Sequence, residues 1–266
     1  MSRIERFYDN DTQYEWDRLD RHRTEFAVTM RALGDYLPKP PAKILDVGGG
    51  PGRYAIALTQ QGYEVTLCDI SRKCLEFAET KAKEAGVKLS GCVRSNATDL
   101  SEFPREGYDA VLLMGPLYHL LEADEREKAV SEARRVLKPG GPLFAAFITR
   151  YAPILYAAAY EPEWINDQQK LEKLLGTGVL KGGPEGKGFT DAYFAHPSEI
   201  KKLMEAGGFE TLDVIACEGI VGTCENKINE LTGEQWQGWV GLNYRLGKDP
   251  TVWGAAYHLL HVGRKR

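Results

Sequence analysis

The stretch KILDVGGGPGRYAIALTQQGYEVTLCDIS, residues Lys43–Ser71, decides the fold of this chain. It begins with an apolar run, turns through four closely spaced glycines and a proline, and continues with RYAIALTQQ, whose composition is typical of a helix. Gly62 then ends that helix, and YEVTLCD forms a second apolar run that closes on an acid. The order strand, glycine turn, helix and strand predicts a parallel βαβ unit.

The same alternation continues to about residue 150. Further strands are expected at 87–94, 108–114 and 142–149, and helices at 72–85 and 124–137. Strands that alternate with helices of this length predict an α/β fold with a doubly wound parallel sheet. Upstream, residues 11–37 carry apolar residues at helical spacing and end at a PKPP sequence, so one or two amphipathic helices are expected before the first strand.

Composition narrows the class of function. The 266 residues carry a formal net charge of -4 without the clustered basic residues that a broad nucleic-acid surface needs, so no nucleic-acid partner is expected. No apolar run is long enough to cross a membrane, and the N-terminus lacks the apolar core of a signal peptide, so we expect a cytoplasmic protein without a membrane partner. The five cysteines show no CxxC spacing, which indicates reduced thiols and no metal site.

The glycine turn marks the expected binding site, because ligands of a doubly wound sheet bind beyond the carboxyl ends of its strands, where the strand order reverses. Gly48, Gly50 and Gly52 follow the first strand directly, where glycine permits close approach of the backbone to a ligand. The free N–H groups of the next helix point to the same spot. Asp69 closes the second strand, and a carboxylate there can accept the hydroxyls of a ribose. A nucleoside-containing cofactor is therefore expected.

Two features separate the candidate cofactors. A dinucleotide fingerprint requires G-x-G-x-x-G, whereas the last glycine of GGGPG comes one residue early. Asp46 precedes the loop by two residues, and its carboxylate would repel a pyrophosphate but attract a cofactor that carries an ammonium and a sulfonium. A nicotinamide oxidoreductase is the less favoured alternative, and a turn that only lets helix and strand pack closely is another.

These residues resemble the class I S-adenosylmethionine-dependent methyltransferases, in particular their small-molecule, UbiE-like branch. LDVGGGPGRYAIAL is similar to that family's first motif, VTLCDIS to its second, YDAVLLMGPLYHL to its fourth-strand motif, and EARRVLKPGGPLFAAF to its helix, turn and fifth strand. In RSNATDL, Asn96 replaces the acid that the family often has. The likeness covers roughly residues 40–150 and implies S-adenosylmethionine as the cofactor. The cofactor-binding residues that it implies are Asp46, Gly48, Gly49, Gly50, Gly52, Asp69, Ile70, Asn96, Ala97, Met114 and Tyr14.

The resemblance assigns a contact to several of these side chains. Asp69 would accept from the ribose and Ile70 would lie beside the adenine. The amide oxygen of Asn96 would accept from the adenine amino group, and Tyr14 would close over the methionine end of the cofactor.

The resemblance also implies the organisation of the whole chain, residues 1–266, as a single Rossmann-like domain. It has a seven-stranded sheet whose last strand is antiparallel, with the sixth strand at 211–220 and the seventh at 255–265. The expected parts are an N-terminal helical cap (1–40), a cofactor-binding core (41–150) and two insertions (151–188 and 223–250) that form a helical lid with the cap. The glycine-rich residues 176–188 are expected to be a long loop or a hinge.

The chemistry points to the end of the fourth strand. A sulfonium is an activated methyl donor, so the protein must align a nucleophile and exclude water, and it needs a base if that nucleophile carries a proton. Because this edge faces the methyl group in the family, Tyr118 and His119 are candidate catalytic residues; alternatively, His119 caps the next segment or fills space under the lid. His258 and His261 are expected to be structural. We expect a small-molecule methyl acceptor, with RNA or protein methylation and cofactor binding without catalysis as alternatives.

Overall fold

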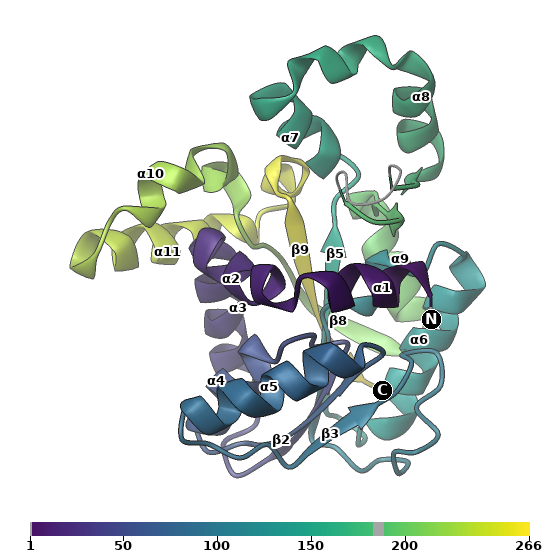
Figure 1. Ribbon diagram of the computed structural model, residues 1–266, viewed down its shortest axis with the longest axis vertical. Coiled ribbons are helices and arrows are strands. Elements are labelled where there is room, and N and C mark those ends of the chain that lie inside the picture. Colours follow the sequence, from purple (N-terminus) through teal and green to yellow (C-terminus); the bar gives the residue numbers. More distant parts are fainter. Residues whose placement is uncertain (1, 183–188) are drawn as a thin grey trace.

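A seven-stranded sheet forms the centre of the computed structural model, which describes residues 2–182 and 189–266 (Figure 1). Its strands are β1 Lys43–Val47, β2 Glu64–Asp69, β3 Gly91–Arg94, β4 Ala110–Leu113, β5 Pro142–Ile148, β8 Phe209–Ala216 and β9 His258–Lys265. Their order is β3-β2-β1-β4-β5-β9-β8, and β9 is antiparallel to both of its neighbours. This confirms the predicted α/β, Rossmann-like sheet with its antiparallel last strand. The order reverses between β1 and β4, so the switch point lies beside the glycine turn.

Helices cover both faces of the sheet, which explains why its central strands are apolar throughout. In β4, Ala110 and Leu112 belong to one buried cluster, whereas Val111 and Leu113 belong to the other. The first cluster is completed by α3 Arg23–Tyr36, α4 Arg53–Gln60, α5 Arg72–Glu84 and α11 Gly233–Gly247. The second is completed by α6 Ala123–Val136 and α9 Pro197–Ala206.

Two short helices, α1 Arg3–Asn10 and α2 Thr12–Arg21, precede α3. The sequence predicted helices only from residue 11, but α1 begins earlier because the Ser2 side chain caps it by accepting the N–H of Glu5. Glu5 pairs with Arg94 at the end of β3 (2.6 Å), and Asp9 accepts from the hydroxyl of Ser71 after β2 (2.6 Å). These contacts hold α1 across the carboxyl ends of β2 and β3.

The insertion after β5 forms α7 Ala152–Tyr160, the 3₁₀ turn η2 Pro162–Asn166 and α8 Gln168–Thr177, which stand off from the sheet in Figure 1. A two-stranded sheet of β6 Val179–Leu180 and β7 Ala192–Tyr193 follows. Part of the expected glycine-rich loop therefore forms β6, while residues 183–188 lie outside the described residues.

The insertion between β8 and β9 contains η3 Gly219–Cys224, α10 Glu225–Asn229, α11 and η4 Pro250–Ala255. It differs in part from the expected lid, because α11 packs beside α3 and β8 and contributes Trp236, Val240 and Tyr244 to the core. The elements at the edge where the lid was expected are η3 and α10, which follow the carboxyl end of β8, and η4, which directly precedes β9. Among the helices of the described residues, none is long and apolar enough to span a membrane.

Candidate active site

The glycine turn after β1 folds tightly around the carboxylate of Asp46. A Cβ atom on Gly49 would lie 2.4 Å from Oδ2 of Asp46, so no other residue fits there without displacing that side chain. Gly50 has φ +55°, a value that favours glycine, and a Cβ there would meet nothing within 4 Å. The loop is therefore closed on the side of Asp46 and open at Gly50, whose backbone is accessible to a ligand.

Asp46 itself is a buried acid that is only 1% exposed. Among the residues that the structure describes, neither of its carboxylate oxygens has a hydrogen-bond partner of normal geometry or a paired cation. Burial, followed by the nearby charge of Asp69, raises the pKa of Asp46 to about 7, an effect that the Ala55 amide offsets only in part. Because an ionised carboxylate is costly to bury alone, this side chain calls for a cationic partner.

Asp69 joins the end of β2 to the glycine turn. Its Oδ2 accepts the N–H of Gly50 (2.9 Å) and its Oδ1 accepts the N–H of Ser71 (2.8 Å). Burial raises the pKa of Asp69 to about 6 even though these hydrogen bonds favour the charged form. Each carboxylate oxygen can accept a second hydrogen bond, so the side chain retains the capacity to bind two hydroxyls.

The other residues implied for the cofactor follow the carboxyl edge of the sheet. Ile70 comes directly after β2, and its carbonyl accepts from the Arg94 side chain (3.0 Å). Asn96 is exposed, and its Oδ1 accepts the N–H of Thr98 (3.1 Å), so a contact with an adenine would need its second lone pair. Ala97 is buried beside it, and Met114 is half-buried at the end of β4.

His119 lies beyond β4, after the 3₁₀ turn η1 Pro116–Tyr118, and is 9% exposed. Its Nδ1 lies 3.5 Å from the carbonyl oxygen of Asp191, and its Nε2 lies 2.7 Å from the hydroxyl of Tyr8. Since a carbonyl only accepts, Nδ1 carries the proton and Nε2 accepts from Tyr8. Burial lowers the pKa of His119 to about 4. His119 is thus a neutral imidazole whose lone pair is already occupied.

Tyr118 ends the 3₁₀ turn that follows β4, and its ring packs edge-on against His119, with 4.7 Å between the ring centroids. Burial raises the pKa of its hydroxyl, Arg18 opposes this shift, and the carboxylates of Glu15, Glu25 and Asp69 add to it. The charges of Asp69 and Glu25 therefore both raise the pKa of this hydroxyl.

The cap contributes a residue that sequence reasoning missed. Tyr8 on α1 packs edge-on against His119, with 5.4 Å between the ring centroids. Tyr14, expected to close over the cofactor, is instead 61% exposed on α2, with the guanidinium of Arg21 3.9 Å from its ring centroid. Tyr14 thus lies outside the buried group, and its contact with the cofactor stays a prediction. The signal for α1, a serine followed three residues later by Glu5, is present in the sequence.

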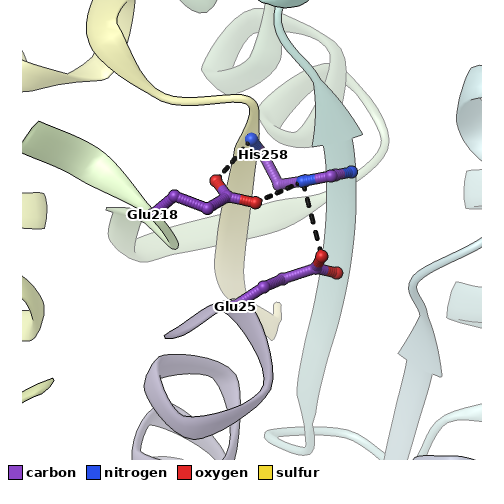
Figure 2. Close-up of side chains that lie close together, drawn as sticks. All are labelled: Glu25, Glu218 and His258. Carbon is purple, nitrogen blue, oxygen red and sulfur yellow. Dashed lines mark hydrogen bonds and ion pairs between the residues drawn. The ribbon is translucent and has the colours of Figure 1, made fainter. Parts of the chain in front are cut away.

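A second group of polar side chains lies at the start of β9, where Figure 2 shows His258 close to two glutamates. Its Nδ1 lies 2.5 Å from Oε1 of Glu218 and 3.6 Å from Oε2 of Glu25. Arg18 donates to both oxygens of Glu25 (2.6 and 3.1 Å). Burial alone would lower the pKa of His258, but the two carboxylates outweigh it and raise that pKa to about 9. We refer to Arg18, Glu25, Glu218 and His258 as the His258 cluster. Sequence reasoning missed it, having treated His258 as structural.

Comparison with known proteins identifies the family. Residues 44–141 match the family described as "Methyltransferase domain". The ubiquinone biosynthesis O-methyltransferase of Xylella fastidiosa is 30% identical over 187 residues, which cover 70% of this chain and 68% of that protein. This chain belongs to the class I S-adenosylmethionine-dependent methyltransferases. Among other members of the family, the ubiquinone/menaquinone biosynthesis C-methyltransferase UbiE of Ralstonia nicotianae is 26% identical over 192 residues, covering 69% of this chain and 74% of that protein.

Solved methyltransferase structures share the fold. A methyltransferase from Methanosarcina mazei superposes with a TM-score of 0.62 at 22% identity, covering 88% of this chain and 96% of that one. A methyltransferase from Clostridium acetobutylicum gives a TM-score of 0.60 at 14% identity, covering 96% of this chain and 98% of that one. Membership of the family establishes the chain as a methyltransferase that uses S-adenosylmethionine. It agrees with the predicted methyl-transfer activity and with the glycine spacing that disfavoured a nicotinamide cofactor.

Proposed function

We propose that this methyltransferase acts on a small-molecule acceptor, held between the carboxyl edge of the sheet and the helices of the cap and insertions. The cofactor end of this proposal is supported by the carboxylate of Asp46, which is buried without a partner among the described residues, beside a glycine turn that is open at Gly50; the acceptor end is supported by helix α1, tied across the carboxyl ends of β2 and β3. When bound, S-adenosylmethionine supplies an electrophilic methyl group and two positive charges. The carboxylate of Asp46 supplies the complementary negative charge. Without a cationic ligand, this carboxylate would stay buried and unpaired among the described residues.

The proposed roles follow from the contacts of each residue. Asp46 provides the negative charge for the ammonium end of the cofactor, and the open backbone at Gly50 lets the ligand approach. Asp69, which keeps one free lone pair on each oxygen, accepts the ribose hydroxyls. Ile70, Asn96, Ala97 and Met114 flank the adenine, while Gly48, Gly49 and Gly52 shape the turn. Tyr14 is proposed to contact the methionine end of the cofactor.

The arrangement of α1 supports a small acceptor. This helix is tied to the ends of β2 and β3 by Glu5 and Asp9, so it covers the edge at which the cofactor is expected. Relatives at 26–30% identity carry names from ubiquinone and menaquinone biosynthesis, which also favours a small organic acceptor. We propose that Tyr118 and His119 shape the acceptor side of this space. His119 does so as a neutral ring, because Tyr8 occupies its Nε2.

Calorimetry with S-adenosylhomocysteine tests the cofactor site, with NAD as the matched control ligand. We expect the first to bind and the second to show no heat. A screen of small phenols, amines and carboxylates with labelled S-adenosylmethionine then tests the acceptor class. Label transfer to RNA or protein in place of every small molecule in the screen would refute the proposed acceptor.

A further inference from the structure

We propose that His258, oriented by Glu218, takes the proton of the acceptor's nucleophile, and that the acceptor is accordingly a molecule with an acidic hydroxyl, such as a phenol. This inference rests on the proposed function and deepens it. It is carried by the geometry of the His258 cluster and by the position of that cluster at the carboxyl edge of the sheet.

Glu218 holds His258 at two points. One carboxylate oxygen lies 2.5 Å from Nδ1 of the ring, and the other accepts the backbone N–H of the same residue at 2.9 Å. These two hydrogen bonds keep one proton on Nδ1 and make Nε2 the basic position, as a carboxylate does for a histidine base in hydrolases. Across the part of the chain that the structure describes, no hydrogen bond is made to Nε2. Figure 2 shows this atom on the side of the ring away from both carboxylates.

The antiparallel direction of β9 places His258 next to the expected site. As the first residue of β9, it pairs with Ile148, the last residue of β5, so it lies at the carboxyl edge. The end of β4 is two strand spacings away, about 10 Å. Tyr118, which follows β4, has a hydroxyl whose pKa is raised by burial and by the charges of both Glu25 and Asp69. The His258 cluster and the glycine turn therefore lie at the same carboxyl edge of the sheet.

The other histidine at this edge is less suited to the role. His119 already accepts a hydrogen bond at Nε2, and burial lowers its pKa to about 4. His258 is 18% exposed, its Nε2 makes no such bond, and its pKa is raised to about 9 by the two carboxylates. A base must reach the proton it removes, and His258 satisfies this geometric requirement where His119 does not.

A divalent metal in the same cluster is disfavoured by its hydrogen bonds. Glu25, Glu218 and His258 offer three ligand atoms within 4.8 Å of one another. However, Arg18 donates to both oxygens of Glu25, and Nδ1 of His258 is protonated toward Glu218. A metal ligand must be deprotonated, so a cation would have to displace both interactions.

The charges that face His258 set the protonation of the complex. Arg18 from α2 pairs with Glu25 from α3, and the imidazolium of His258 pairs with Glu218. Glu225 from α10 lies farther out and pairs with His22 (2.9 Å). At neutral pH the free ring is an imidazolium, so binding of the acceptor hydroxyl expels one proton to solvent, and the proton left between the acceptor oxygen and Nε2 resides on Nε2. The oxygen then forms its bond to the methyl carbon as the carbon–sulfur bond breaks onto sulfur, and the proton stays on Nε2.

The spectrum of 4-nitrophenol tests the proposal without turnover, because the phenolate absorbs at longer wavelength than the phenol. With the full-length protein saturated with S-adenosylhomocysteine, we expect bound 4-nitrophenol to show the phenolate band at a pH where free 4-nitrophenol is mostly protonated. His258→Gln should abolish the band. The matched control is His261→Gln, a buried histidine of the same strand that contacts Thr211, and it should keep the band.

Loss of the band in the control but not in His258→Gln, or no band with the wild-type protein, would overturn the inference. If His258→Gln does not fold, ring NMR of the wild-type protein decides: the His258 signals must move on addition of 4-nitrophenol, and unmoved signals refute the role. With a phenolic acceptor in hand, kcat of a folded variant should fall about 10²–10⁴-fold. Calorimetric binding of S-adenosylhomocysteine is independent of these readouts, so its failure would refute the proposed function instead.

Discussion

Replacing Asp46 by asparagine should stabilise the unliganded protein at alkaline pH and weaken its cofactor binding. The folded protein raises the pKa of this carboxyl from an ordinary 3.8 to about 7. The folded state therefore keeps a proton that the unfolded state has released, and stability falls as pH rises through this window. At pH 8, where the carboxylate is charged in both states, the cost reaches its full value.

The size of the effect follows from the shift in pKa. About three pH units at 1.36 kcal/mol each give a cost of about 4 kcal/mol for the buried charge at pH 8. The amide that replaces the carboxylate would instead be a neutral buried group without partners, which costs about 1–3 kcal/mol. Asp46→Asn should thus raise the free energy of unfolding by about 1–3 kcal/mol at pH 8. At pH 4.5, where Asp46 is protonated in the folded state, most of the charge cost is absent and the substitution should bring no gain.

Urea denaturation at both pH values measures the stability, and calorimetry measures the affinity for S-adenosylhomocysteine. Loss of a charge-assisted hydrogen bond of about 1.5–3 kcal/mol should weaken binding by roughly ten- to a hundredfold. Asp109→Asn is the matched control, because Asp109 pairs with Lys138 at the opposite end of the sheet and has a lowered pKa. It should destabilise slightly and leave affinity unchanged. A destabilised Asp46→Asn protein with wild-type affinity would refute the assignment.

Three further outcomes are expected. Asp69→Ala should weaken S-adenosylhomocysteine binding roughly tenfold or more by calorimetry, since it removes charge-assisted acceptors, and an unchanged Kd would place the ribose elsewhere. Deleting residues 2–10 should also lower this affinity while Tm changes little, because the buried residues of α1 are the polar Glu5 and Asp9; full affinity in the truncated protein would show that α1 does not cover the site. The third concerns His258, whose folded pKa of about 9 lies above the ordinary 6.5, so its stabilisation is complete below pH 6.5 and is lost as pH rises through 9. Urea denaturation should show that the free energy of unfolding falls by about 3 kcal/mol over this range. A His258→Gln protein with the same pH dependence would argue against His258 as the source of this loss.

The sequence was most informative where the interacting residues are close together along the chain. Asp46, the glycine turn and Asp69 lie within one βαβ unit, so their spacing predicted both the fold and the cofactor end of the site. The antiparallel last strand was implied by the family resemblance and not by a local pattern, and the structure confirms it.

Contacts made across long sequence distances were not predictable in this way. Glu25, Glu218 and His258 come from three separate parts of the chain, which meet through the pairing of β8 with β9 and the packing of α3 against β9. The position of the cap was missed for a similar reason. Tyr8 reaches His119 because ionic contacts dock α1 on the sheet, whereas Tyr14, the better match by motif, lies on the exposed side of α2.

The strand order also links the unfolding of two strands. In the seven-stranded sheet, β8 pairs only with β9, while β9 also pairs with β5. Any opening that detaches β9 therefore leaves β8 without a backbone partner, and the α11 helix that packs on β8 loses its support. The slowest amide hydrogens of β8 should exchange with the same opening free energy as those of β9, as one cooperative unit. This unit includes His258, so the residue proposed to take the acceptor's proton is held in place by the integrity of the far edge of the sheet.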